Sequence, residues 1–336
     1  MLPAYLAEML RGFQASRIAL TAVELNVFTA VGKGAAAEEV ASRIGADSRA
    51  TAILLDALAA LGLLEKRGAT YRNTPDTARY LDEASPENER LATLHTVHMW
   101  QTWSTLTECV RAGGSVTARE EKPAEKDWTE AFIAAMARNA AERAPRVAAA
   151  VGAERVRRML DIGGGPGSYA IAFARANPRL RAVVLDKPEV LEIARRHIAA
   201  AGFEERITTQ PGDLKRDRFG EGYDLALVSN ICHMLSPEQN RDLLARAAAA
   251  LVPGGRLVIH DFILDGDRTS PQAAAVFAVN MLVATAAGNS YTEQEYAAWL
   301  QAAGLGEVQR IEIDGPTDLM VARKTPPEGR DAEEKS

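Results

Sequence analysis

From residue 154 onward, short apolar runs of strand length alternate with longer segments in which apolar residues recur at helical spacing. Alternation of this kind predicts a parallel, doubly wound α/β sheet with helices on both faces. Ligands of such sheets bind at the carboxyl ends of the strands, so we look there for a functional site. The predicted strands lie near 156–162, 181–186, 205–210, 223–229, 255–261 and 307–313, with a last strand near 317–323.

The first part of the chain has mostly helical periodicity. Residues 62–74 are an exception, because they alternate like a small hairpin after two helical segments joined by a polar turn at 45–48. We interpret the helix-turn-helix and hairpin as a winged helix. The predicted helices span 15–28, 36–44, 49–61, 91–111 and 127–151.

A DNA-binding role for this motif is disfavoured by its second helix. In DNA-binding proteins with this motif, the second helix carries side chains that reach the base edges. Here the helix over 49–61 has Arg49 as its one arginine and an otherwise apolar face, which favours packing against another subunit. We expect a homodimer formed through an N-terminal domain over 1–152, then a second domain over 153–325 and a disordered tail over 326–336.

Composition and charge exclude further classes of protein. The 336 residues have a net charge of −6 and no basic block, which argues against a nucleic-acid partner. Cys109 and Cys232 are the only cysteines, too few for a metal cluster and suited to a reducing compartment. With no basic leader and no apolar run of about 18 residues, we expect a cytoplasmic protein without a membrane span. We expect no bound metal, since no clustered carboxylate–histidine set stands out.

A glycine-rich segment follows the first predicted strand of the sheet. Asp161 precedes glycines at 163, 165 and 167, and glycine allows positive φ and close approach of a ligand. Asp186 ends the second strand, where an acid is placed to bind ribose hydroxyls. The alternative is a plain strand-to-helix turn, but together the two features predict a pocket for an adenosine-containing cofactor.

The glycine spacing distinguishes between such cofactors. A dinucleotide fingerprint has its third glycine where this chain has Ser168, and the G-x-x-x-x-G-K-[ST] phosphate loop is absent. Asp161 would repel a pyrophosphate but attract a cationic amino group. S-adenosylmethionine has a ribose and an ammonium group and lacks phosphate, so we predict it as the cofactor.

Candidate residues also follow the other predicted strands. Gly212 and Asp213 come after the third, where an acid could reach the adenine amino group. His233 stands just past the fourth strand, and is either structural or a base that deprotonates a phenol for attack on a sulfonium methyl group. Asp261 ends the fifth strand and either orients His233 or caps the next segment. His260 should point to the opposite face and is expected to be structural.

These segments resemble the S-adenosylmethionine-dependent O-methyltransferases of the plant caffeic-acid type and their bacterial natural-product counterparts. The resemblance covers nearly the whole chain. It implies a Rossmann-like methyltransferase sheet at the C-terminus behind a mainly helical, winged-helix dimerisation domain at the N-terminus. The matching segments are Leu160–Gly167, Leu185–Val190, Gly212–Leu214, Ser229–His233, Leu251–Leu257 and Tyr291–Tyr296.

The resemblance also implies roles for individual residues. His233 corresponds to the catalytic base and Asp261 to one of two acids that flank it. With the residues already singled out, the expected cofactor site comprises Asp161, Gly163, Gly165, Asp186, Gly212, Asp213, Leu214, Ser229 and Asn230. The residues that fall where the family lines its acceptor pocket are Trp100, Trp103, Met136, Asn280 and Met281.

Two positions depart from the plant enzymes. Met234 and Ser290 stand where those enzymes have acids near the base. Some relatives methylate carbon or use the same fold and cofactor for hydroxylation, decarboxylation or pericyclic steps. The presence of His233 favours O-methylation of an aromatic or polyketide-like small molecule, with S-adenosylhomocysteine as the second product.

Overall fold

The computed structural model describes residues 2–117 and 126–325, so the tail expected over 326–336 lies outside the described residues. The chain forms two compact units. The first contains the described residues 2–101 and 126–135, and the second contains 102–117 and 136–325. Within these described ranges, no helix is long and apolar enough to cross a membrane.

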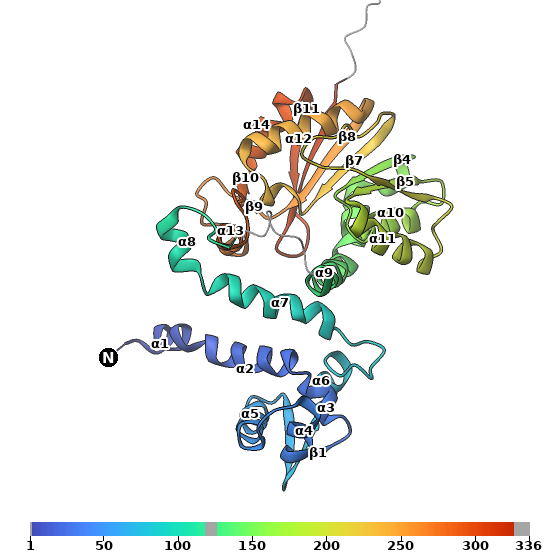
Figure 1. Ribbon diagram of the computed structural model, residues 1–336. Helices are drawn as coiled ribbons and strands as arrows, with labels where there is room; N and C mark the ends of the chain where they lie inside the picture. The colour runs from blue at the N-terminus through green and yellow to red at the C-terminus, as the bar shows by residue number, and fades with distance from the viewer. Residues whose placement is uncertain (1, 118–125, 326–336) are drawn as a thin grey trace, which may run out of the picture. The chain divides into compact units, whose positions relative to one another are not determined.

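The first unit packs short helices around a three-stranded antiparallel sheet (Figure 1). Its elements are α1 (Ala4–Arg11), α2 (Phe13–Glu24), α3 (Val27–Val31), β1 (Ala35–Ala36), α4 (Ala37–Ile44), α5 (Ser48–Ala60), β2 (Leu64–Arg67), β3 (Thr70–Asn73), α6 (Pro75–Tyr80) and most of α7 (Arg90–Trp103). Gly45 ends α4 with a φ of 66°, and the Asp47 carboxylate begins α5 by accepting from the Ala50 N–H at 2.8 Å. The predicted helix-turn-helix and hairpin are thus confirmed as elements.

Two helices predicted as continuous are each divided in two. The segment 15–28 breaks because Asn26 adopts a left-handed φ of 58° between α2 and α3. The segment 91–111 breaks between α7 and α8 (Leu106–Ala112), where the Thr105 hydroxyl donates to the Thr102 carbonyl at 2.8 Å. That bond competes with the helical hydrogen bonds. The hydrophobic spacing continues across both breaks and therefore does not reveal them.

Seven strands of the second unit form one sheet with the order β11-β12-β8-β7-β4-β5-β6. All the predicted strands are present, as β4 (Arg158–Ile162), β5 (Arg181–Asp186), β6 (Ile207–Pro211), β7 (Tyr223–Ser229), β8 (Leu251–Asp261), β11 (Leu305–Ile311) and β12 (Asp318–Lys324). The strands from β8 to β6 pair in parallel, but β12 is antiparallel to both of its neighbours. Residues 312–317 alone join β11 to β12, and this connection is too short for a parallel crossover.

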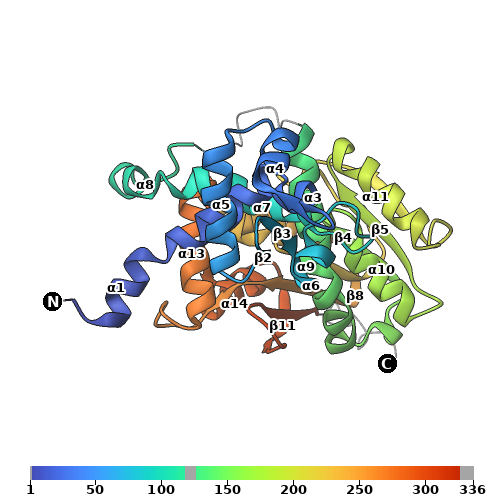
Figure 2. The same ribbon diagram turned by 90° about the horizontal axis from the view of Figure 1, so that it is seen from below.

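Helices cover both faces of the sheet. The helices after β4, β5, β7 and β10 (Tyr291–Thr292) are α10 (Ser168–Ala176), α11 (Pro188–Ala200), α12 (Pro237–Ala250) and α14 (Glu293–Ala302). On one face α10 and α11, with the later part of α9 (Lys126–Val151), enclose a core around Phe173 (Figures 1 and 2). On the other face α12 and α14 enclose a core around Leu244 and Trp299. Burial on both faces explains why the strands are apolar at nearly every position.

The strand order reverses between β4 and β7. From β4 the chain moves outward to β5 and β6, whereas from β7 it moves to β8 on the other side. The loops after β4 and β7 therefore flank a topological switch point, where doubly wound sheets bind their ligands. Beyond β8 the chain adds β9 (Ile263–Leu264), α13 (Gln272–Ala284) and β10 (Tyr291–Thr292), and β9 and β10 form a separate small parallel pair.

Candidate active site

The glycine loop after β4 is held against the end of β5. Gly163, Gly165 and Gly167 have φ values of 68°, 53° and 78°, a region that favours glycine. The Gly163 N–H donates to the Leu185 carbonyl at 2.8 Å. A Cβ on Gly163 would lie 2.5 Å from the Ile231 side chain, so a larger residue would collide with the loop after β7. A Cβ on Gly165 meets nothing within 4 Å, which shows open space beside the loop.

Asp186, at the end of β5, is anchored to this loop by its side chain. Its Oδ2 accepts from the Gly165 N–H at 2.9 Å, and its Oδ1 accepts from the Lys187 N–H at 2.7 Å. Burial raises the pKa of Asp186, although both backbone donors oppose that effect. An acid fixed in this way at the second strand end has the position that ribose-binding acids occupy in such folds.

Asp161 is a buried carboxyl group with an unused oxygen. It is fully buried; its Oδ2 accepts from the Ala170 N–H at 3.3 Å, and its Oδ1 has no hydrogen-bond partner among the described residues. Burial, with a smaller contribution from the charge of Asp186, raises the pKa of Asp161 to about 7. An unpaired carboxylate oxygen inside a protein is costly, so it suits a cationic ligand group.

His233 and Asp261 meet at the ends of β7 and β8. His233 lies in the short turn Cys232–Met234, and its Nδ1 is 2.6 Å from Asp261 Oδ1. Asp261 Oδ2 also accepts from the His233 N–H at 3.1 Å, and Oδ1 from the Phe262 N–H at 2.8 Å. Asp261 is therefore hydrogen-bonded both to His233 and to the first residue of the segment that follows.

Asp261 is an anion despite its burial. Burial alone would raise the pKa of Asp261, but the interaction with His233 and the hydrogen bonds from His233 and Phe262 outweigh it and lower the pKa. A carboxylate can only accept hydrogen bonds, so His233 Nδ1 carries the proton in this pair. Among the described residues none hydrogen-bonds His233 Nε2. This arrangement suits a general base.

Two phenylalanines that the sequence analysis missed pack beside the His233 ring. Phe277, on α13, lies edge-on to it at a centroid distance of 4.8 Å. Phe262 stacks on Phe277 at 3.8 Å and is itself 6.4 Å from the His233 ring. Phe262 directly follows Asp261, so its position next to a candidate site residue could have identified it from the sequence. Phe277 lies on a helix that is apolar on all sides and offered no such signal.

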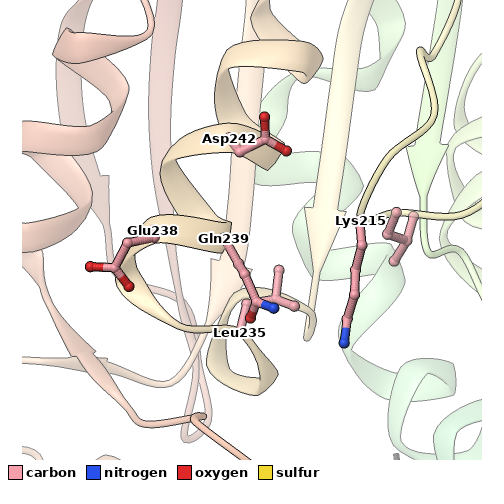
Figure 3. Close-up of a pocket in the computed structure, with 6 residues that line it drawn as sticks. Lys215, Leu235, Glu238, Gln239 and Asp242 are labelled. Atoms are coloured by element: carbon pink, nitrogen blue, oxygen red, sulfur yellow. The ribbon is translucent and has the colours of Figure 1, made fainter.

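The segment Gly212–Leu214 follows β6 and borders a cavity of about 280 Å³. The Gly212 N–H donates to the Asp186 carbonyl at 3.0 Å, while the Asp213 carboxylate accepts from Lys215 N and Arg216 Nε in its own loop. Figure 3 shows Lys215 on one side of this cavity and the early turns of α12, with Glu238, Gln239 and Asp242, on the other side. The cavity is lined by Leu214, Lys215, Leu235, Glu238, Gln239 and Asp242, of which the sequence analysis named only Leu214.

The residues expected in the acceptor pocket are partly brought together. Trp103 Nε1 donates to Asn280 Oδ1 at 2.9 Å, and Met281 is buried on the same helix as Asn280. Met136 is half-buried in the second unit. Trp100 belongs to the first unit, where the Arg17 guanidinium lies 5.8 Å from its ring centroid.

The two positions that depart from the plant pattern do not orient the base by side-chain hydrogen bonds. The Ser290 hydroxyl donates to the Ala274 carbonyl at 2.8 Å, away from His233. Met234 has an apolar side chain and packs against the core on the α12 face. Within the described part of the chain, Asp261 is the acid that holds His233.

The fold and this site together define a Rossmann-like methyltransferase. A family model described as the O-methyltransferase domain matches residues 103–306, and one described as the O-methyltransferase dimerisation domain matches residues 7–83. The chain therefore belongs to the O-methyltransferase family, as the resemblance in the sequence implied.

Individual relatives agree with this assignment. The chain is 35% identical to a 3-hydroxy-5-methyl-1-naphthoate 3-O-methyltransferase of Streptomyces sahachiroi, over 94% of this chain and 92% of that protein. It is 31% identical to the tetracenomycin polyketide synthesis 8-O-methyl transferase of Streptomyces glaucescens, over 96% and 97%. It matches the crystal structure of human N-acetylserotonin methyltransferase in complex with S-adenosylmethionine with a TM-score of 0.80 and 27% identity, covering 97% and 99%.

Proposed function

We propose that this O-methyltransferase transfers a methyl group from S-adenosylmethionine to a hydroxyl, phenolic in character, on an aromatic or polyketide-like small molecule. The observation that carries the proposal is the His233–Asp261 pair at the ends of β7 and β8, in which no described residue is hydrogen-bonded to Nε2 of His233. His233 lies in the loop after β7 at the switch point of the sheet, and Ile231 of the same loop lies against Gly163 of the glycine loop. A base in that position can act on an acceptor only if the methyl donor lies along the same strand ends.

The residues at those strand ends fit S-adenosylmethionine. Asp186 is fixed for the ribose, the open side of Gly165 allows close approach, and the unpaired oxygen of Asp161 suits the ammonium group. We place the adenine end beyond Asp186, toward Gly212–Leu214. When bound, the cofactor supplies a methyl group on a positively charged sulfur, with S-adenosylhomocysteine as the second product. The related human enzyme whose structure contains S-adenosylmethionine supports this choice.

In the proposed reaction the chain positions the acceptor hydroxyl and removes its proton. Asp261 keeps the proton of His233 on Nδ1, so Nε2 can take the proton of the hydroxyl. The carboxylate then stabilises the imidazolium that forms. Phe277 and Phe262 limit the access of water to the ring and offer apolar surface to an aromatic acceptor. The named reactions of the two Streptomyces relatives support an aromatic or polyketide-like acceptor.

The test is incubation with S-adenosylmethionine that carries a trideuterated methyl group, together with a panel of naphthols, hydroxynaphthoates and larger phenolic polyketides. We expect S-adenosylhomocysteine to accumulate and one acceptor to gain the labelled methyl. The carbon-13 shift of the transferred methyl distinguishes attachment to oxygen from attachment to carbon. A labelled methyl on carbon, or conversion of an acceptor without S-adenosylhomocysteine, would contradict the proposal.

We also propose that the enzyme is a homodimer formed through its first unit. The dimerisation model covers 7–83, and α1 buries none of its residues. Large apolar side chains of this segment are exposed, namely Leu2, Tyr5, Met9, Leu10 and Phe13. Exposed apolar surface of this kind marks a protein interface.

Charged residues on α1 are expected to convert this dimer to a monomer, because they would place carboxylates in an apolar interface. The variant is Tyr5→Asp combined with Met9→Asp, measured by light scattering during size-exclusion chromatography. Val110→Asp is the matched control, since Val110 is an exposed apolar residue of α8 in the second unit. A wild-type monomer, or a double variant that remains dimeric, would show that this face is not the interface.

A further inference from the structure

His260 is a second buried histidine, adjacent to Asp261 on β8 but on the opposite face of the strand. Its Nδ1 lies 2.9 Å from the Ser229 hydroxyl and 3.1 Å from the Tyr169 hydroxyl, and its Nε2 lies 2.8 Å from the Thr317 hydroxyl. Burial lowers the pKa of His260 to about 4, so the ring is neutral near pH 7. One ring nitrogen then carries a proton and the other accepts.

The neighbouring groups decide which nitrogen accepts. The Ser229 oxygen receives a hydrogen bond from Asn230 Nδ2 at 3.0 Å, so its own proton is free to be donated to His260 Nδ1. Burial raises the pKa of Tyr169, which keeps its proton; the Tyr169 hydroxyl lies 3.1 Å from the same nitrogen and also interacts with the side chains of Ser229 and Asn230. With Ser229 as the donor to Nδ1, whose single lone pair accepts one hydrogen bond, Nε2 carries the proton and donates to Thr317.

The Asn230 carboxamide has the orientation that goes with this polarity. Because Nδ2 points to Ser229, Oδ1 points the other way, and no described residue donates a hydrogen bond to it. The backbone of Asn230 is also held, since its N–H donates to the His260 carbonyl at 2.8 Å and its φ is 55°. The side chain therefore presents a fixed, unused acceptor at the end of β7.

The strand order shows which part of the cofactor that acceptor would meet. The order β6-β5-β4-β7 places Asp161 at the end of the strand between those that carry Asp186 and Asn230. A cofactor with its ribose at Asp186 and its methyl near His233 has its amino-acid part over β4 and β7. There the Oδ1 atoms of Asp161 and Asn230, to which no described residue is shown to donate, are both acceptors, which matches an ammonium donor.

We infer that His260, with Tyr169 and Thr317, is a positioning relay that turns the Asn230 carboxamide oxygen toward the ammonium group of the cofactor. His260 acts through Ser229 and touches neither cofactor nor acceptor. The inference rests on the proposed function, because it assumes that the ligand is S-adenosylmethionine.

The first test is nitrogen-15 NMR of the wild-type protein labelled at histidine, with His260→Gln used only to assign its signals. We expect His260 to show an unprotonated Nδ1 and a protonated Nε2. The reverse tautomer would turn Ser229 and Asn230 around and overturn the inference. This test does not depend on whether any variant folds.

The second test uses Thr317→Val, which changes the relay at its end remote from the cofactor. Without an acceptor for Nε2–H, His260 is expected to shift its proton to Nδ1 and donate to Ser229, which would then turn Asn230. We expect S-adenosylhomocysteine to bind about tenfold more weakly, as for loss of a hydrogen bond to a charged group. Affinity for 5′-methylthioadenosine, which lacks the amino-acid part, should stay within about twofold.

The matched control is Thr77→Val, because Thr77 is a buried threonine of the first unit whose hydroxyl donates to the Leu63 carbonyl. Equal weakening of both ligands by Thr317→Val would indicate a general structural role and overturn the relay, as would no weakening of either. A wild-type protein that binds neither ligand would instead remove the proposed cofactor. The two failures are therefore distinguishable by calorimetry of the wild type alone.

Discussion

Replacement of His233 by alanine is expected to lower kcat by about 10² to 10⁴, the usual contribution of a general base. Cofactor affinity should stay within about twofold, because His233 is assigned to the acceptor hydroxyl and not to the cofactor. The reason is specific to this pair. Asp261 Oδ1 lies 2.6 Å from Nδ1 and holds the proton there, so the proposed role of the ring depends on Nε2, to which no described residue is hydrogen-bonded. The measurement is single-turnover methyl transfer, with the dissociation constant of S-adenosylhomocysteine determined separately.

The control for this variant is His197→Ala. His197 is an exposed histidine on α11 and is not part of the site, so its loss should leave kcat unchanged. If His233→Ala retained wild-type turnover on a good acceptor, His233 would not be the base. A loss of turnover accompanied by an equal loss of cofactor affinity would instead indicate that the loop after β7 had collapsed.

The sheet was predictable because its strands are buried on both faces and read as short apolar runs. The antiparallel orientation of β12 was not predictable from the hydrophobic pattern. The direction of a strand depends on the length of the connection before it, and this direction does not change which residues are apolar. The helix breaks at Asn26 and Thr105 were not predicted for a similar reason. Each arises from one backbone angle or one side-chain hydrogen bond within a continuous helical pattern.

The candidate site was predictable where residues stand at strand ends. The carboxyl ends of parallel strands share one edge, so Asp161, Asp186, His233 and Asp261 could be placed together without a structure. The contact of Phe277 on α13 with the His233 ring could not be foreseen, because it arises only through tertiary packing. Trp103 and Asn280 were expected in one pocket from the family resemblance, but their hydrogen bond across 177 positions of sequence is visible only in the structure. The partners of His260 were missed because a buried histidine shows its hydrogen bonds only in three dimensions.

Asp161 should make the cofactor-free enzyme less stable as the pH rises from about 4 to about 7. Its pKa is raised from 3.8 to about 7 in the folded chain, chiefly by burial, so the folded state binds a proton more tightly than the unfolded state. The free energy of unfolding then falls wherever the folded carboxyl is protonated and the unfolded one is not. A shift of about three pKa units, at about 1.4 kcal/mol each, sets an upper limit of about 4 kcal/mol.

The measurement is urea unfolding of the wild type and of Asp161→Asn between about pH 4 and about pH 8. Asparagine is nearly isosteric and does not titrate, so the difference between the two proteins isolates Asp161 from other acids such as Asp186. We expect that difference to move in favour of the variant as the pH rises and to level off above about pH 7. A difference that does not change with pH would show that Asp161 titrates normally.

Saturation with S-adenosylhomocysteine should reverse this trend in the wild type. The ammonium group would pair with the ionised carboxylate, whose Oδ1 otherwise lacks a partner, and so remove the cost of its buried charge. Asp161→Asn cannot form that ion pair, and its gain in stability from the ligand should be smaller at about pH 8. An equal gain in both proteins would place the ammonium elsewhere and leave Asp161 as a buried acid that shapes the glycine loop through Ala170.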